Sequence, residues 1–260
     1  MSGARVAVVT GAGRGLGRMI AERLARAGYH VMCTDIDEGA AHVTAALVEG
    51  SAMAHDVRDA DAHRAVAFAA AAKGDIVAWV NNAGVLNVGD TWEIDDALVR
   101  RMVEVNLLGV MWGSHAAVGA MREGTILNIA SMSAIVPTPG LAVYGATKHG
   151  VLGFSLSLAA ELRRAKRPIT VSSLLPDAIA GDMTSAVAHD EHAGLLFSNN
   201  QLSLDDVADA AVQMIAKPRL VKTIPRYRAA MIHLLRPFPA VGLPLLDRFA
   251  AIGRKRQAKR

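Results

Sequence analysis

Several features common in other protein classes are scarce in this chain. Its 260 residues include a single cysteine, Cys33, so no intramolecular disulfide can form. Aromatic residues make up only 4% of the sequence, and no apolar run is long enough to span a bilayer. The nine histidines show no metal-ligand spacing, so we predict no metal site. The chain is therefore not held together by disulfides within it, and we expect no membrane-spanning helix.

The start of the chain gives no indication of a secretory signal. The residues MSGA lead directly into an apolar segment, so we expect no signal peptide. Together with the single cysteine, this favours a cytoplasmic location. Hydrophobic residues form 52% of the chain, which is enough for a sizeable core.

Acidic residues are almost absent from the end of the chain. Residues 217–260 contain 12 lysines and arginines but one acid, whereas residues 1–216 contain 16 against 23 acids. The net charge of +4 therefore combines an acidic body with a basic tail. We divide the chain into a body, residues 1–225, and a basic amphipathic extension, residues 226–260.

The body alternates short apolar runs with segments of helical character. The predicted strands span residues 5–10, 30–34, 51–54, 75–80, 125–130, 168–175 and 221–224. The predicted helices include residues 92–121, 145–166 and 203–216, and residues 178–202 are expected to form an irregular lid. Because no Gly/Ser-rich linker interrupts this alternation, we predict an α/β fold: a single-domain, Rossmann-type, doubly wound parallel sheet of about seven strands.

A glycine-rich turn joins the first predicted strand to the first predicted helix. Glycines permit a tight turn and let backbone N–H groups approach a pyrophosphate, which the helix N-terminus also favours. Between a strand and a helix, this pattern predicts a dinucleotide site. Its expected contacts are Gly11, Arg14, Gly15, Leu16 and Gly17.

Asp35 follows the second predicted strand, eighteen residues past Gly17. A carboxylate at that position accepts hydrogen bonds from an adenosine ribose diol and repels a 2′-phosphate, which favours NAD over NADP. Arg14 argues the other way, because a guanidinium in the glycine loop can neutralise a phosphate. An ordinary loop acid is the alternative interpretation of Asp35.

Further cofactor contacts are expected where other strands end, because the carboxyl ends of parallel strands share one edge of the sheet. Asp56 is predicted to accept a hydrogen bond from an adenine amino group. The other predicted contacts are Ile36, Val57, Asn82, Ala83, Gly84, Pro176 and Ile179.

The stretch from 128 to 151 carries the residues best suited to proton transfer. Tyr144 and Lys148 are four residues apart, so on a helix they share one face. An ammonium beside a phenol favours the phenolate and lowers a tyrosine pKa that is ordinarily about 10. Ser131, at a strand end, can bind the same substrate oxygen, and Ser133 is an alternative on spacing alone. A surface Tyr–Lys pair is the competing interpretation.

Taken together, these motifs resemble the classical short-chain dehydrogenase/reductase family over about 225 residues. TGAGRGLG at 10–17 matches the family pattern TGxxxGxG, and NNAG at 81–84 is identical to its fourth-strand motif. Asn106, Ser131, Tyr144 and Lys148 fall where the family has its catalytic tetrad.

The resemblance implies a role for each of these four residues. Tyr144 would exchange a proton with the substrate oxygen, which Ser131 would position. Lys148 would hold the nicotinamide ribose and lower the pKa of Tyr144, and Asn106 would hold a water that links Lys148 to solvent. Tyr144 and Lys148 are therefore also cofactor contacts.

The resemblance implies an NAD(H)-dependent oxidoreductase that interconverts a secondary or primary alcohol and a carbonyl. An NADPH-dependent 3-oxoacyl-thioester reductase is the alternative within the same fold. A non-catalytic NAD-binding sensor is the alternative from another class, although such a protein would not need Ser131 or the phenol.

The chain departs from the family pattern after the sixth predicted strand. Asp177 stands where the family usually has glycine, and Gly181 where it usually has threonine, with Thr184 nearby. The family's glycine-rich C-terminal strand is absent, so a homodimer through residues 92–121 and 146–165 is preferred over a homotetramer.

The extension contains two short periodic segments. Each is predicted to present an apolar helical face, formed by Tyr227, Met231, Leu234 and Leu235 and by Leu245, Leu246, Phe249 and Ile252. Apolar faces flanked by basic residues suit an anionic membrane surface, and docking on the body or on a partner subunit is the equal alternative. Membrane contact would favour a lipophilic substrate such as a steroid, retinoid or long-chain lipid. Nucleic-acid binding is not expected, because the tail lacks interleaved aromatics.

Overall fold

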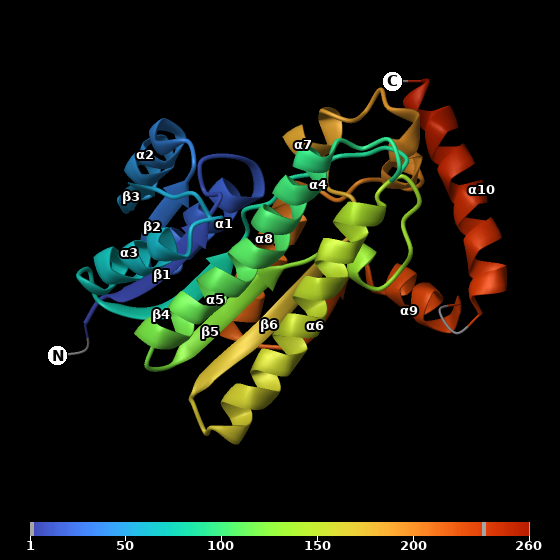
Figure 1. The fold of residues 1–260 in the computed structure, drawn as a ribbon. Coiled ribbons are helices and arrows are strands. Elements are labelled where there is room, and N and C mark those ends of the chain that lie inside the picture. Colours follow the sequence, from blue (N-terminus) through green and yellow to red (C-terminus); the bar gives the residue numbers. More distant parts are fainter. Residues whose placement is uncertain (1–2, 236–237, 260) are drawn as a thin grey trace.

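The computed structural model describes residues 3–235 and 238–259, with only the backbone described at residues 233, 235 and 239. Within this part of the chain, seven parallel strands form one sheet in the order β3-β2-β1-β4-β5-β6-β7 (Figure 1). Their bounds are β1 Arg5–Thr10, β2 His30–Asp35, β3 Ser51–Ala54, β4 Asp75–Asn81, β5 Gly124–Ile129, β6 Ile169–Pro176 and β7 Val221–Ile224. The predicted doubly wound sheet is confirmed. The order reverses between β1 and β4, which opens a crevice there for a ligand.

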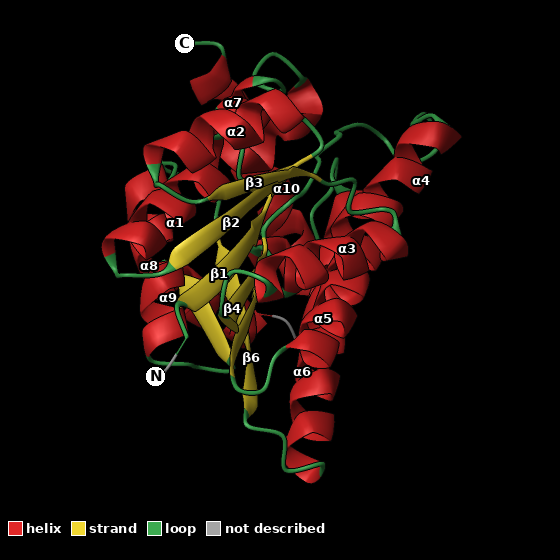
Figure 2. Cartoon of the chain, turned by 90° about the vertical axis from the view of Figure 1, so that its left-hand side faces the viewer, coloured by secondary structure: helices red, strands yellow, loops and turns green. Residues whose placement is uncertain are grey.

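Helices cover both faces of the sheet, as the end-on view shows (Figure 2). α1 and α8 pack together on one face, and α3, α5 and α6 lie on the other. The helix bounds are α1 Gly15–Arg26, α2 Glu38–Leu47, α3 Ala60–Ala71, α4 Asp96–Val103, α5 Gly109–Ala120, α6 Ala142–Arg164, α7 Asp182–Ser185, α8 Leu204–Ala216, α9 Arg226–Leu235 and α10 Pro239–Gln257.

The strands read as continuous apolar runs because both faces of the sheet are buried. Side chains alternate between the two faces, so Ala7 and Val9 join the cluster under α1 and α8. Val6 and Val8 join the cluster on the opposite face. The hydrophobic core is therefore two layers, one on each side of the sheet.

Three segments differ from the predicted elements. The helix predicted at 92–121 begins at Asp96, and the π-helical turn Glu104–Leu108 divides it into α4 and α5. Helix α2 was not predicted; Asp37 caps it by accepting a hydrogen bond from the backbone N–H of Ala40 at 3.0 Å. The segment expected to be an irregular lid contains α7 and the 3₁₀ helix Glu191–Phe197, which we call η3.

The extension folds onto the body as α9 and α10. The buried face of α9 differs from the prediction, whereas in α10 the predicted face members Leu245, Leu246 and Phe249 line the cavity together. In α9 the buried residues are Ala229 and Ile232, whereas Tyr227 and Leu234 are exposed; the side chain of Leu235 lies outside the described residues. Arg228, one helical turn before Ile232 and on the same face, pairs with Asp177 of the body. In α10, Ile252 is exposed.

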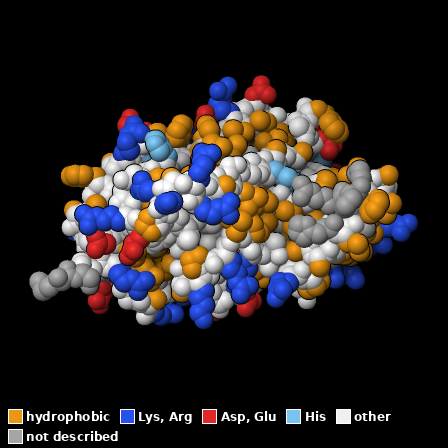
Figure 3. All heavy atoms as spheres, turned by 90° about the horizontal axis from the view of Figure 1, so that it is seen from below, with side chains coloured by type: hydrophobic (Ala, Val, Ile, Leu, Met, Phe, Trp, Pro, Cys, Tyr) orange, Lys and Arg blue, Asp and Glu red, His pale blue; other side chains and the backbone are white. Residues whose placement is uncertain are grey.

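Two observations bear on how the molecule could interact with a membrane. None of the helices built from residues 3–235 and 238–259 combines the length and apolar character needed to cross a bilayer. Seen from below, the molecule shows lysine and arginine side chains spread around exposed hydrophobic ones (Figure 3).

Candidate active site

The glycine loop after β1 has the geometry of a phosphate cradle. Gly11 and Gly15 have φ angles of +64° and +53°, in the left-handed region that favours glycine. A Cβ at Gly17 would lie 2.0 Å from the carbonyl oxygen of Gly11, so only glycine fits there. At Gly15 a Cβ would meet no atom within 4 Å, because this backbone faces the open cavity. The loop therefore fits a dinucleotide pyrophosphate at the start of α1.

Asp35 connects this loop to the end of β2. Its Oδ2 accepts a hydrogen bond from the backbone N–H of Gly13 at 2.9 Å, and its Oδ1 accepts one from that of Asp37 at 3.1 Å. The carboxylate also lines the cavity, with lone pairs left for a ligand. Asp35 is thus positioned by the loop and available to a ribose diol.

The NNAG segment is tied to the glycine loop through hydrogen bonds. The side-chain amide of Asn82 donates to the carbonyl oxygens of Thr10 and Gly11 at 3.0 and 3.1 Å. The Thr10 hydroxyl accepts from the backbone N–H groups of Asn82 and Ala83 at 3.0 and 3.1 Å. These bonds hold the ends of β1 and β4 together where the crevice opens.

One cavity of about 1100 Å³ extends from the glycine loop to the extension. It is lined by every predicted cofactor residue, from the loop after β1 to the loop after β6. These residues are Gly11, Arg14, Gly15, Leu16, Gly17, Asp35, Ile36, Asp56, Val57, Asn82, Ala83, Gly84, Tyr144, Lys148, Pro176 and Ile179.

The environment of Asp56 differs from the prediction. Both of its carboxylate oxygens accept hydrogen bonds from Arg58, whose Nε lies 2.9 and 3.0 Å from them. This pairing lowers the pKa of Asp56 and leaves less capacity for an adenine amino group. Arg58 also lines the cavity, and the sequence analysis missed it. The spacing of Arg58, two residues after Asp56, is the sequence feature from which this pairing could have been predicted.

Lys148 lines the cavity yet is almost fully buried, on the face of α6 that carries Tyr144. Its Nζ donates to the carbonyl oxygen of Ile129 at 3.0 Å and lies 5.6 Å from the centroid of the Tyr144 ring. Burial without a carboxylate partner lowers the pKa of Lys148 to about 8. The pair is therefore not an ordinary surface pair, because Lys148 is only 4% exposed.

The pKa of Tyr144 moves in the direction opposite to the prediction. Burial raises it to about 12, and a hydrogen bond with the Ser131 hydroxyl opposes this only in part. Desolvation is the dominant cause, and the Nζ of Lys148 donates to the Ile129 carbonyl and not to the phenol. At neutral pH the phenol is protonated, which suits a proton donor.

Ser131 lies at the end of β5 and begins the short 3₁₀ turn Met132–Ala134. Its Oγ accepts a hydrogen bond from the backbone N–H of Ser133 at 3.1 Å, so its own hydrogen is free to be donated. Both serines line the cavity. The bond between Ser131 and the Tyr144 phenol distinguishes it from Ser133.

Asn106 is fully buried and does not line the cavity. Its side-chain amide accepts from the backbone N–H of Val85 and donates to the Val85 carbonyl, both at 2.8 Å. It lies in the π-helical turn, so this asparagine has both the partner and the distortion expected of a buried mid-helix residue. Its part in holding a water stays a prediction.

Local contacts describe the region of two of the three departures from the family pattern, Asp177 and Gly181 with its neighbour Thr184. Asp177 pairs with Arg228 of α9, and both side chains are mostly buried. Thr184 donates to the carbonyl oxygens of Ile179 and Gly181 at 2.7 and 3.0 Å, which holds the start of the lid. Asp177 therefore connects β6 to the extension, a contact that the sequence did not predict.

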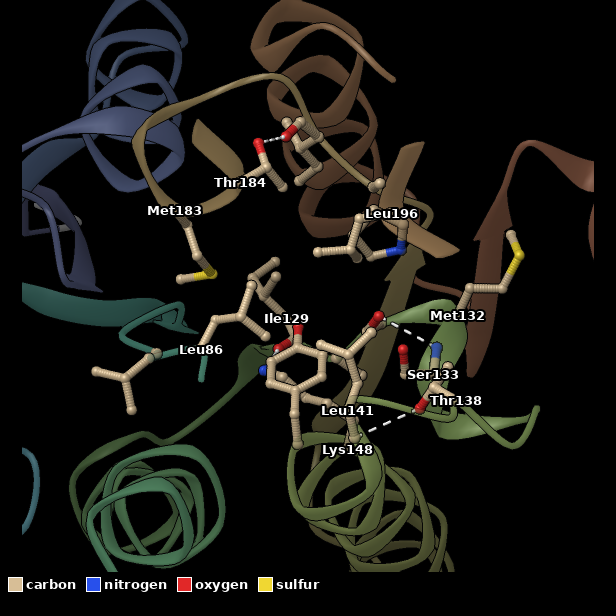
Figure 4. A pocket seen from close by; sticks show the side chains of 18 of the residues that line it. Leu86, Ile129, Met132, Ser133, Thr138, Leu141, Lys148, Met183, Thr184 and Leu196 are labelled. Carbon is tan, nitrogen blue, oxygen red and sulfur yellow. Dashed lines mark hydrogen bonds between the residues drawn. The ribbon is translucent and has the colours of Figure 1, made fainter. Parts of the chain in front are cut away.

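The part of the cavity beyond Tyr144 is mainly apolar. Leu86, Leu141, Met183 and Leu196 surround the space next to Lys148 (Figure 4). Across the described residues, no cluster of three or more His, Cys, Asp or Glu is arranged to hold a metal ion. The cavity is thus a dinucleotide groove that continues past the Tyr144 phenol and the Ser131 hydroxyl. Beyond them lies the region lined by Leu86, Leu141, Met183 and Leu196, which we call the apolar chamber.

Comparisons with known proteins agree with this geometry. The family model described as short chain dehydrogenase matches residues 5–192. The 3-oxoacyl-[acyl-carrier-protein] reductase FabG of Escherichia coli is 36% identical over 74% of this chain and 80% of that protein. The 1-deoxy-11-beta-hydroxypentalenate dehydrogenase of Streptomyces arenae is 34% identical over 83% of this chain and 80% of that protein.

Solved structures show the same fold. A short-chain dehydrogenase/reductase from Burkholderia phymatum, in complex with NAD, is 27% identical with a TM-score of 0.84 and covers 92% of this chain and 95% of that one. A putative short-chain alcohol dehydrogenase from Sinorhizobium meliloti has a TM-score of 0.73 at 34% identity over 83% of this chain and 89% of that one. With its glycine loop, its Ser/Tyr/Lys cluster and these relatives, the chain belongs to the short-chain dehydrogenase/reductase family and is a nicotinamide-dependent oxidoreductase acting on CH–OH groups.

Proposed function

We propose that this protein is an NAD(H)-dependent oxidoreductase that interconverts a lipophilic secondary alcohol and its ketone. The observation that carries the proposal is the position of Tyr144 and Ser131 between the dinucleotide groove and the apolar chamber. A primary alcohol and its aldehyde would use the same groups. The apolar lining supports a lipophilic substrate, because a polar one would leave its hydrogen-bonding groups unsatisfied there.

Tyr144 and Ser131 act on the substrate oxygen. The bound nicotinamide cofactor supplies a hydride to the carbonyl carbon in reduction and takes one from the alcohol carbon in oxidation. In reduction, Tyr144 gives its phenolic proton to the carbonyl oxygen as the carbon is reduced. Ser131 donates a hydrogen bond to the same oxygen and stabilises the negative charge that develops on it. In oxidation the proton returns from the alcohol to Tyr144.

Lys148 has two expected roles, in binding the cofactor and in setting the pKa of Tyr144. Its Nζ lies next to the cavity, where it can bind a nicotinamide ribose. The pKa of Tyr144 is raised to about 12 and must fall for the phenolate to form, and a cationic Lys148 that moves toward the phenol would lower it. We therefore expect the rate of alcohol oxidation to rise with pH up to about 8, where Lys148 is still cationic, because oxidation requires the phenolate.

The central test is substitution of Tyr144 by phenylalanine. Turnover of an alcohol panel, read as nicotinamide absorbance, is expected to fall by about 10²–10⁴-fold, whereas binding of NADH by fluorescence titration stays within about threefold. Tyr227→Phe is the matched control, because Tyr227 is exposed on α9 and does not line the cavity. Full turnover in Tyr144→Phe would refute the mechanism. Undetectable turnover in the wild type with NADH bound would favour the non-catalytic sensor.

The preference for NAD rests on Asp35. Its carboxylate lines the cavity beside the glycine loop and would repel a 2′-phosphate. Arg14 and Arg58 also line this region and are the groups that would favour NADP. Titration with NADH and NADPH is expected to show a lower Kd for NADH. Asp35→Ser should reduce the ratio of the NADPH Kd to the NADH Kd by about tenfold or more. Tighter NADPH binding by the wild type would overturn this assignment.

A 3-oxoacyl-thioester reductase using NADPH is the second candidate. It is supported by the name of the Escherichia coli relative and by Arg101, a cation in the cavity lining that could meet an anionic carrier group. Oxidation of NADPH with acetoacetyl-coenzyme A separates the candidates. Efficient thioester reduction, with weak activity on simple alcohols, would favour this one.

The assembly and the surface contacts of the protein are proposed on simpler grounds. Partly exposed Trp112 on α5 and Leu156 on α6 support a homodimer through these helices, with a homotetramer as the alternative. Sedimentation velocity distinguishes the two. Membrane contact would involve the exposed Tyr227, Leu234 and Phe238 of the extension, and a cytoplasmic protein without membrane association is equally compatible. Failure to co-sediment with anionic liposomes would remove the membrane proposal.

A further inference from the structure

The C-terminal extension forms part of the cavity wall. Helix α10 contributes four large apolar side chains to the lining: Leu243, Leu245, Leu246 and Phe249. They come from a region past residue 192, where the match to the family model ends. In Figure 1, α10 runs along the side of the molecule beyond α7 and the lid. This wall is therefore a feature of this chain that the family motifs do not describe.

Helix α10 rests directly on the backbone of the lid. A Cβ at Gly253 would lie 1.7 Å from the carbonyl oxygen of Gly194, so the two segments touch through glycines. Arg256 donates to the carbonyl of Ser198 at 3.0 Å. The Gln257 amide donates to the carbonyls of Ala188 and Asp190 at 3.0 and 2.9 Å. The lid and α10 are thus joined along the helix.

Helix α9 fixes the other end of the extension to the body. Arg228 pairs with Asp177 at the end of β6, and Ala229 and Ile232 are buried in the cluster that contains Val151 and Leu175. Because α9 is held on β6 and α10 is held on the lid, the extension lies across the cavity. Its position is therefore defined well enough to limit what the cavity holds.

The chemistry of this wall indicates what it faces. The described cavity-lining residues of α10 are apolar or glycine, whereas Asp247 and Arg248 of the same helix are exposed. Among the described side chains of α9, Arg228 is the cation in the lining, and it pairs with Asp177. An apolar substituent gains from burial here, and a charged one would lose its hydration without a partner.

We propose that Leu246 and Phe249 of α10 determine the length of the apolar substituent that the active site accepts on the alcohol carbon. This rests on the proposed function, because it assigns the far end of the chamber to the part of the substrate remote from the reacting carbon. Apolar burial that is realised in the transition state raises kcat/KM, so selectivity should follow chain length.

The test is a homologous series of 2-alkanols, from 2-butanol to 2-dodecanol, oxidised by the full-length protein. In the wild type, kcat/KM is expected to rise by up to about fourfold per methylene, equivalent to about 0.8 kcal/mol, and then to level off. Leu246→Trp should move the plateau to shorter alcohols and lower kcat/KM for the longest by about tenfold or more.

Two further variants complete the experiment. Phe249→Ala should move the plateau to longer alcohols, and it covers the case in which the tryptophan variant does not fold by circular dichroism. Ile252→Ala, on the exposed side of the same helix, is the matched control and should reproduce the wild-type profile.

The outcomes separate this proposal from the proposed function. Turnover with a length dependence unchanged in both folded variants refutes the role of α10 and leaves the oxidoreductase assignment standing. No turnover of any alkanol by a wild type that binds NADH refutes both the proposed substrate class and the role of α10.

Discussion

Substitution of Arg228 by methionine tests how the extension is held. The change keeps an unbranched apolar stem but removes the charge that pairs with Asp177. The two side chains are only 16% and 14% exposed. Removing one partner of a fully buried pair costs about 3–5 kcal/mol, because the other charge is left without a partner. An exposed pair is worth about 0–1 kcal/mol. For this mostly buried pair, we expect a loss of about 2–3 kcal/mol in the free energy of unfolding.

The assay is urea unfolding followed by circular dichroism, with thermal unfolding as a second measure. A loss of this size corresponds to a Tm decrease of about 4–10 °C for a chain of this length. Combining Arg228→Met with Asp177→Asn should recover much of the loss, because no charge then remains buried. Arg248→Met, at an exposed position of α10, is the control and should change stability by less than about 0.5 kcal/mol.

Two results would refute this reasoning. One is a single variant as stable as the wild type, which would mean that the pair contributes nothing to holding the extension. The other is a double variant that loses as much as Arg228→Met alone, which would show that the lost contact and not the unpaired carboxylate determines the cost.

Three further predictions follow from the cofactor groove and the buried titratable groups. Gly17→Ala should weaken NADH binding by at least about tenfold in fluorescence titration, because the new Cβ would lie 2.0 Å from the Gly11 carbonyl oxygen; unchanged affinity would contradict the loop geometry. Lys148→Met should abolish turnover yet stabilise the cofactor-free protein by about 1–3 kcal/mol at pH 7, because burial lowers the pKa of Lys148 to about 8 and the charged form is costly when folded; a destabilised variant would argue against that cost. Burial lowers the pKa of His55 to about 3 in the folded protein. Between pH 6.5 and 3 His55 is therefore protonated in the unfolded chain but neutral in the folded one, so the free energy of unfolding falls as the pH falls. The loss from His55 at pH 5 is about 2 kcal/mol, and urea unfolding of His55→Asn should show a shallower decline than the wild type.

The alternation of apolar strands and helices was sufficient to predict the sheet. Strands such as β1 and β4 are buried on both faces, so their valine-rich runs are visible without knowledge of their neighbours. Helix α2 was missed because its stability comes from the Asp37 cap and from packing beside β2 and β3, not from a strong apolar stripe. The π-helical turn at Asn106 also depends on a partner, Val85, that is distant in sequence.

The groove and the proton-transfer residues were predictable because each depends on local spacing. The glycine loop needs only its own backbone geometry, and Tyr144 and Lys148 need only one helical turn between them. Their pKa values were not predictable. Desolvation depends on how many atoms surround a group, and burial by the whole fold raises the pKa of Tyr144 where an adjacent lysine alone suggested that it would fall.

Local periodicity and short motifs were enough to predict the fold class, the dinucleotide loop and the residues proposed for proton transfer. The position of the extension and the buried face of α9 became known only from the folded molecule. Asp177 and Arg228 are far apart in the chain, and they pair on the face of α9 on which Ile232, not Leu234, is buried. The wall that α10 places across the cavity follows from such distant contacts, for which short-range sequence patterns carry no signal.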